Sequence, residues 1–249
     1  MLIHRLWNAP VGKADLIKKG IIQPSFNSEL TRVALEAYNA YNNSSFHPSN
    51  DTAGSKRRKR KTTRRSTKNL SISNDVSGLT LNDYFFEHQK VKGYVHGTPI
   101  LSQSKEIQHF QTVVLSQIDK YFTLIDREAA ETIQEKVQSG IVSLDLWAAI
   151  QKSDNSYHKC HVHEGALLSG VYYSCIPKES APLTFHKYDE NLEGLDELSI
   201  CPQEGQIILF PPWMPHEVPP RNYITERVSY AFNLSGPYIG DPWEITRNM

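Results

Sequence analysis

The stretch Tyr157–Cys175, YHKCHVHEGALLSGVYYSC, carries two histidines, His161 and His163, two residues apart. On a β-strand such residues point to the same face, so both imidazoles can reach one point. A second stretch, Phe210–Asn233, FPPWMPHEVPPRNYITERVSYAFN, supplies His216 after an apolar run typical of a strand. Three neutral imidazoles on one face suit Fe(II), Zn, Cu or Ni and leave coordination positions open. The three are the predicted metal ligands; the alternative is that two of them are ordinary half-buried histidines.

A basic residue follows this histidine set on the next strand-like run. The run RVSYAFN begins at Arg227, and its alternation places Arg227, Ser229, Ala231 and Asn233 on one face. An arginine inside a barrel is an uncompensated charge unless it meets an anion, and its planar fork matches a carboxylate. We therefore predict that Arg227 binds a ligand carboxylate, with a surface salt bridge as the plainer alternative.

The second half of the chain, after Gly140, has the texture of an all-β domain. Short β-rich runs separated by Pro, Gly, Asn and Asp are typical of an antiparallel sandwich or barrel. The runs cover residues 141–150, 160–163, 167–175, 183–185, 206–210 and 227–234. We expect residues 141–249 to form a catalytic core of mainly β structure, a jelly roll of the cupin type.

Residues 1–140 predict a support for this core that is mainly helical. The strongest helical periodicity runs over Ser104–Ile125, and residues 128–138 continue it as a second helix. An earlier helix follows a capping residue at Asn27 or Ser28. Residues 1–25 are consistent with an edge strand and a short helix. The support and the core are expected to make one structural unit.

One segment of this support, residues 46–77, is rich in Ser, Asn, Thr, Lys and Arg and predicts a disordered loop. Within it, residues 56–68, KRRKRKTTRRSTK, hold nine of the 27 Lys and Arg, which leaves 18 basic against 27 acidic residues elsewhere. Such a tract is typical of contact with nucleic acid or an import receptor. A solvated loop with no partner is the alternative.

The cysteines and the hydropathy pattern bear on location. Cys160, Cys175 and Cys201 show no CxxC spacing, which favours a reducing compartment over a disulfide scaffold. Apolar runs stay below the roughly 18–20 residues that span a bilayer, and the N-terminus is a poor secretory signal. An intracellular protein, cytoplasmic or nuclear and without a membrane partner, is expected.

Four motifs are spread over residues 144–235, namely H-V-H-x(6)-G-V-Y-Y, P-x-x-G-x-x-x-x-F, P-H-E-V-x-P and R-x-S-x-x-F-N. Together they resemble the 2-oxoglutarate and Fe(II)-dependent oxygenases, and more distantly the prolyl hydroxylases. The resemblance implies a double-stranded β-helix that binds Fe(II) and 2-oxoglutarate and uses dioxygen to hydroxylate an unidentified substrate. It also implies that Arg227 binds the distal carboxylate of 2-oxoglutarate and that Tyr173 assists it.

The chain departs from the wider family at the second ligand. Most members have H-x-D or H-x-E. Here His163 stands at the position of that acid, and the acid Glu164 follows one residue later. Glu164 is out of phase on a regular strand but reaches the metal if a turn begins there, so it stays an alternative ligand. Arg221 is likewise an alternative to Arg227, because the spacing from His216 is about two residues longer than in prolyl hydroxylases.

The missing acid leaves a second function open: a cupin-like metal-binding protein without 2-oxoglutarate chemistry. Further pocket residues are expected among the aromatic and amide side chains of the core, namely Trp147, Gln151, Trp213 and Asn233.

Overall fold

The structure is a computed structural model. It describes residues 1–7, 9–43, 94–96, 104–151, 156–163, 165–187, 196–221 and 225–236. The predicted loop 46–77, its basic tract 56–68 and Glu164 lie outside these ranges. Within them, no helix is long and apolar enough to span a bilayer.

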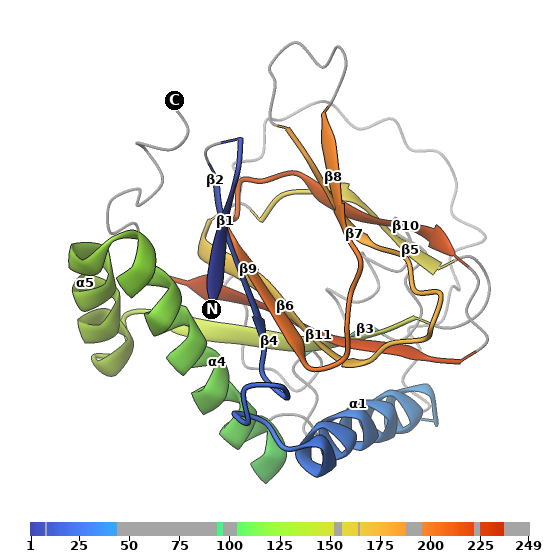
Figure 1. The fold of residues 1–249 in the computed structure, drawn as a ribbon. Helices are drawn as coiled ribbons and strands as arrows, with labels where there is room; N and C mark the ends of the chain where they lie inside the picture. The colour runs from blue at the N-terminus through green and yellow to red at the C-terminus, as the bar shows by residue number, and fades with distance from the viewer. Residues whose placement is uncertain are drawn as a thin grey trace, which may run out of the picture.

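Eight successive strands build two antiparallel sheets that face each other (Figure 1). The strands are β4 (Ser143–Gln151), β5 (Ser156–His161), β6 (Ala166–Cys175), β7 (Leu183–His186), β8 (Glu197–Ile200), β9 (Gln206–Phe210), β10 (His216–Arg221) and β11 (Arg227–Ser235). One sheet contains the order β9-β6-β11-β4 and the other the order β5-β10-β7-β8. Because the chain passes back and forth between the sheets, this is a double-stranded β-helix, and the predicted jelly-roll fold is confirmed.

The N-terminal segment adds strands to the larger sheet as well as helices. The hairpin of β1 (Leu2–Leu6) and β2 (Ala9–Asp15) pairs with β9, and β3 (Tyr94–His96) pairs with β4 at the opposite edge. The sheet therefore has seven strands, in the order β1-β2-β9-β6-β11-β4-β3. The prediction of a mainly helical support gave too little weight to these strands. The division of the chain at residue 140 stays a prediction.

Helices gather on one side of the larger sheet (Figure 1). They are α1 (Pro24–Asn43), α4 (Lys105–Ile125) and α5 (Arg127–Gln138). The side-chain oxygen of Ser104 accepts a hydrogen bond from the Ile107 N–H and begins α4, and Asp126 begins α5 in the same way through Ala129. Both helices follow their predicted ranges closely because periodicity and caps agree.

The start of α1 differs from the prediction. The helix begins at Pro24, a residue favoured at the first helical position, so Asn27 lies inside it and caps nothing. Its buried amide instead donates to the Ser174 carbonyl and to Glu204 Oε1, each at 2.8 Å, and accepts from the Tyr172 hydroxyl at 2.6 Å. Asn27 thereby ties α1 to β6.

The larger sheet separates two apolar clusters. Its outer face packs against the helices through alternate residues of β11, namely Val228, Tyr230, Phe232 and Leu234. The second cluster lies between the sheets and includes Tyr173, Phe185, Ile208, Phe210 and Val218. The remaining alternate residues of β11, from Arg227 to Asn233, therefore face the space between the sheets, as their spacing predicted.

Candidate active site

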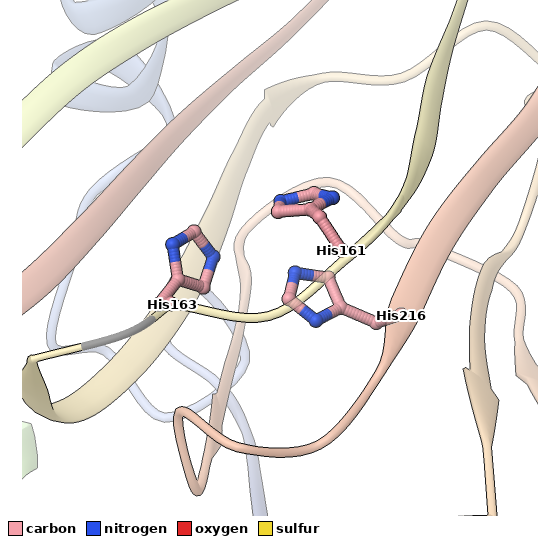
Figure 2. Close-up of side chains that lie close together, drawn as sticks. All are labelled: His161, His163 and His216. Carbon is pink, nitrogen blue, oxygen red and sulfur yellow. The ribbon is translucent and has the colours of Figure 1, made fainter. Parts of the chain in front are cut away.

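Three histidines converge between the sheets (Figure 2). His161 is the last residue of β5 and His216 the first of β10, and the two are directly paired across these strands. His163 lies two residues beyond β5. One nitrogen from each ring can be chosen so that all three lie within 4.8 Å of one another. The predicted trio is thus brought together.

The prediction placed both histidines of the H-x-H pair on one strand, but only His161 is on a strand in the structure. β5 ends at His161, so His163 is not on a regular strand. Its backbone N–H donates to the Pro212 carbonyl at 2.8 Å, which attaches it to the loop before β10. That loop therefore fixes His163 beside His216, whereas strand pairing fixes His161.

All three imidazoles are held in the neutral form that binds metals. Burial lowers the pKa of His163 to about 3, and repulsion between His163 and His161 when both rings are protonated lowers it further. Burial likewise lowers the pKa of His161, and it lowers that of His216 well below its usual value. Because no proton must leave at neutral pH, the donor set suits a divalent transition metal.

Two of the rings are oriented by the main chain. Nδ1 of His161 lies 2.6 Å from the Lys159 carbonyl oxygen, and Nδ1 of His216 lies 2.9 Å from that of Met214. A carbonyl oxygen accepts and cannot donate, so each Nδ1 carries the hydrogen. Nε2 of both rings is left with its lone pair free for a ligand role.

Arg227 lies at the start of β11, opposite Gln151 at the end of β4. It is 2% exposed, and its Nη1 donates to Gln151 Oε1. Its guanidinium carbon lies 5.4 Å from the centre of the Tyr173 ring. Among the described residues, Arg227 Nε and Gln151 Nε2 are buried without a hydrogen-bond partner. Buried N–H donors of this kind are costly unless they meet an acceptor, and a carboxylate supplies one.

The alternative arginine lies elsewhere. Arg221 ends β10, its side chain is 43% exposed, and it pairs with the exposed Glu179 at 3.5 Å. It is solvated, as its Pro-Pro-Arg-Asn context predicted. Arg227 is therefore the better candidate for a buried carboxylate clamp.

The expected pocket residues fall into two groups. Trp147 lies beside His163, with ring centres 6.2 Å apart, and Gln151 and Asn233 contact Arg227 and His163 respectively. Trp213, in contrast, packs against both apolar clusters. His158 was not among the predicted residues. Its Nε2 is buried, and burial, followed by repulsion from a protonated His161 and from Arg227, lowers its pKa. No spacing signal distinguishes it from an ordinary strand residue.

The sequence model of a family described as "Putative 2OG-Fe(II) oxygenase" matches residues 145–233. The match covers a little more than a third of the 249-residue chain and includes the three histidines, Tyr173 and Arg227. No curated protein matches the chain.

Several solved structures resemble the chain distantly. An oxidoreductase of the 2OG-Fe(II) oxygenase family from Burkholderia pseudomallei is 17% identical, with a TM-score of 0.32, over 38% of this chain and 43% of that one. A prolyl-4-hydroxylase from Pseudomonas putida is 16% identical, with a TM-score of 0.40, over 66% of this chain and 88% of that one. A prolyl 4-hydroxylase from Phytophthora capsici is 14% identical, with a TM-score of 0.39, over 66% and 55%. The matched region thus spans less than half of the Burkholderia protein.

A double-stranded β-helix with three convergent imidazoles has the architecture of the cupin and oxygenase barrels, with a histidine set that could hold a metal ion. Residues 145–233 match the sequence model of the 2-oxoglutarate and Fe(II)-dependent oxygenases, which confirms the resemblance seen in the sequence. Members of that family use Fe(II), 2-oxoglutarate and dioxygen.

Proposed function

We propose that this chain is a dioxygenase that couples decarboxylation of 2-oxoglutarate to hydroxylation of a second substrate. His161, His163 and His216 hold Fe(II), and Arg227 and Tyr173 bind the distal carboxylate of 2-oxoglutarate. The observation that carries the proposal is the convergence of three imidazoles, one nitrogen of each within 4.8 Å of the others, in a barrel whose sequence matches the family model.

The histidine set fits a divalent cation in charge as well as in position. Fe(II), when bound, supplies the redox chemistry by which dioxygen oxidises 2-oxoglutarate and the substrate. Three neutral ligands leave the positive charge of the cation uncompensated, which favours an anionic cosubstrate beside it. The surrounding apolar cluster, with Phe185 and Phe210 near His216, limits access of water.

The arginine set fits a carboxylate. Gln151 accepts from Nη1 at one edge of the planar Arg227 guanidinium, which fixes the direction of the remaining donors. The Tyr173 ring lies against the same guanidinium. These residues bind and orient 2-oxoglutarate, and no proton has to move at this end of the molecule.

Release of succinate tests the metal site. With Fe(II), 2-oxoglutarate and dioxygen, the wild type is expected to form succinate even without its substrate, and His216→Ala is expected to lose at least about 100-fold of this rate because one of three ligands is gone. His4→Ala, at an exposed histidine of β1, is the matched control and should match the wild type. Equal succinate release by His216→Ala would contradict the assignment.

Calorimetry under nitrogen tests the carboxylate clamp. Arg227→Ala in the Fe(II)-loaded protein is expected to weaken 2-oxoglutarate binding by about 10- to 150-fold, the effect of losing a charge-assisted hydrogen bond of roughly 1.5–3 kcal/mol. Arg221→Ala removes an exposed arginine and should bind normally. Arg227→Lys keeps the charge without the fork and should fall between the two. If 2-oxoglutarate fails to bind the wild type, a cupin-like metal protein without this chemistry is the better description.

We also propose, from the sequence, that the tract 56–68 contacts nucleic acid or an import receptor and that the protein is cytoplasmic or nuclear. Nine basic residues without an acid support the first proposal, and three cysteines without CxxC spacing support the second.

A further inference from the structure

The three histidines of the cluster are not oriented in the same way. The main chain fixes the rings of His161 and His216 with hydrogen on Nδ1. His163 has a side-chain partner instead: its Nδ1 lies 3.3 Å from Nδ2 of Asn233 on β11. The orientation of this ring therefore depends on a residue of the opposite sheet.

Asn233 is itself held by a second side chain. It is paired directly with Ser169 of β6, and the Ser169 hydroxyl donates to Asn233 Oδ1 at 2.8 Å. Ser169 is fully buried, so this hydrogen bond is protected from water. In the observed orientation the Asn233 amide donates to His163 Nδ1, which places the lone pair of His163 on Nδ1 and its hydrogen on Nε2.

A metal at Nε2 of His163 requires the opposite arrangement, with hydrogen on Nδ1 and an acceptor beside it. Rotation of the Asn233 amide by half a turn supplies that acceptor, because Oδ1 then replaces Nδ2. The Ser169 hydroxyl can both donate and accept, so it then accepts from Nδ2 and no hydrogen bond is lost. The imidazole gains and loses one proton, at Nδ1 and Nε2 respectively, and stays neutral.

We propose that Asn233, held by Ser169, is the positioning residue that orients the His163 ring and, by turning its amide, accepts a hydrogen bond from Nδ1 in the tautomer that makes His163 the third metal ligand. The inference rests on the metal site of the proposed function but not on 2-oxoglutarate chemistry. Strands β6 and β11 carry no proposed metal ligand, but through Ser169 and Asn233 they would orient one.

Imidazole nitrogen NMR of the metal-free protein tests the tautomers without any metal. His161 and His216 are expected to carry hydrogen on Nδ1, whereas His163 carries it on Nε2. In Asn233→Asp, one carboxylate oxygen faces Ser169 and the other faces His163, and both accept. The hydrogen of His163 should therefore move to Nδ1. An unchanged His163 tautomer in Asn233→Asp would overturn the proposal.

Titration with Co(II), followed by its visible absorption, tests the consequence for the metal. Asn233→Leu keeps the size but removes the polar contact and should weaken Co(II) binding by about 10- to 100-fold. Asn233→Asp should bind at least as tightly as the wild type. Ser229→Ala, on the same face of β11, is the matched control and should match the wild type.

The outcomes separate this inference from the metal site itself. If the wild type binds Co(II) and Asn233→Leu binds it equally well, the positioning role is overturned while the metal site stands. Loss of binding in both Asn233→Leu and Asn233→Asp would overturn a role for the hydrogen bond between Asn233 and His163 and would indicate packing instead. A wild type that binds no Co(II) would overturn the metal site and this inference with it.

Discussion

His158 is a half-buried histidine, with its Nε2 buried, that the proposed ligand set leaves unused. Burial, followed by the charges of His161 and Arg227, lowers its pKa to about 3. The same direction holds for all three proposed ligands. Folding therefore keeps several imidazoles neutral that would take up a proton in the unfolded chain.

Stability of the metal-free protein is expected to fall on acidification. The unfolded chain binds protons at His158 below its ordinary pKa of 6.5, whereas the folded chain does so only near 3. The free energy of unfolding is therefore unaffected by His158 above pH 6.5 and falls between pH 6.5 and pH 3. The decrease is up to about 1.4 kcal/mol per pH unit for each such group. Urea unfolding at pH 7, 6 and 5 measures the slope. His158→Gln should show a shallower slope; an identical slope would contradict this reading.

Single residues were predictable to the extent that spacing alone determines them. His161, His163 and His216 stand out because a metal needs several ligands close together, and Arg227 stands out because it follows them on an alternating strand. His158 and Ser169 give no such signal, since their surroundings depend on which strands pair. That information is absent from local sequence.

The attachment of α1 to the barrel depends on Asn27. Replacing it with alanine leaves the Tyr172 hydroxyl and the Ser174 carbonyl without their bonds to this amide, and we expect a loss of about 2–4 kcal/mol in the free energy of unfolding. Chemical denaturation measures the loss. Ser28→Ala, at the exposed neighbouring residue, should change it by less than about 0.5 kcal/mol. Similar values for both variants would show that the network contributes little.

Strand β10 shows why one element escaped the sequence. Its residues HEVPPR include Pro219 and Pro220, which lack the N–H that a strand donates. The structure accommodates them because the pairing of β10 with β5 shifts register on both sides of Val218, and its pairing with β7 is limited to His216 and Glu217. The regular strands and the two capped helices were predictable because their local pattern and tertiary packing agree.

Bound metal is expected to stabilise the whole molecule, because it joins β5, β10 and the loop between β5 and β6. At about 100 times Kd the gain is about 2.7 kcal/mol, which corresponds to roughly 5–11 °C in Tm for a chain of this size. Thermal unfolding with Fe(II) under nitrogen, before and after a chelator, measures it. His216→Ala should show no such shift; a shift of equal size there would indicate binding elsewhere.

At the scale of the molecule, the sequence predicted the barrel and the helices but not how the first residues join them. The double-stranded β-helix follows from regularly spaced β-rich runs. The β1–β2 hairpin extends the sheet through β9, a strand almost 200 residues later in the chain. Pairing over such a separation is decided by packing, and composition does not encode it.

The pairing of β4 with β11 has a consequence for how such a barrel can be extended. Ser143 and Ser235, the first residue of β4 and the last of β11, are partners, and so are Asp145 and Asn233, the bounds of the family match. The chain therefore enters and leaves the barrel at one corner. Segments before and after the barrel are joined to it at that shared corner, even where they pack elsewhere as the β1–β2 hairpin does, so different flanking segments can be joined to this unit without a change in the order of its strands.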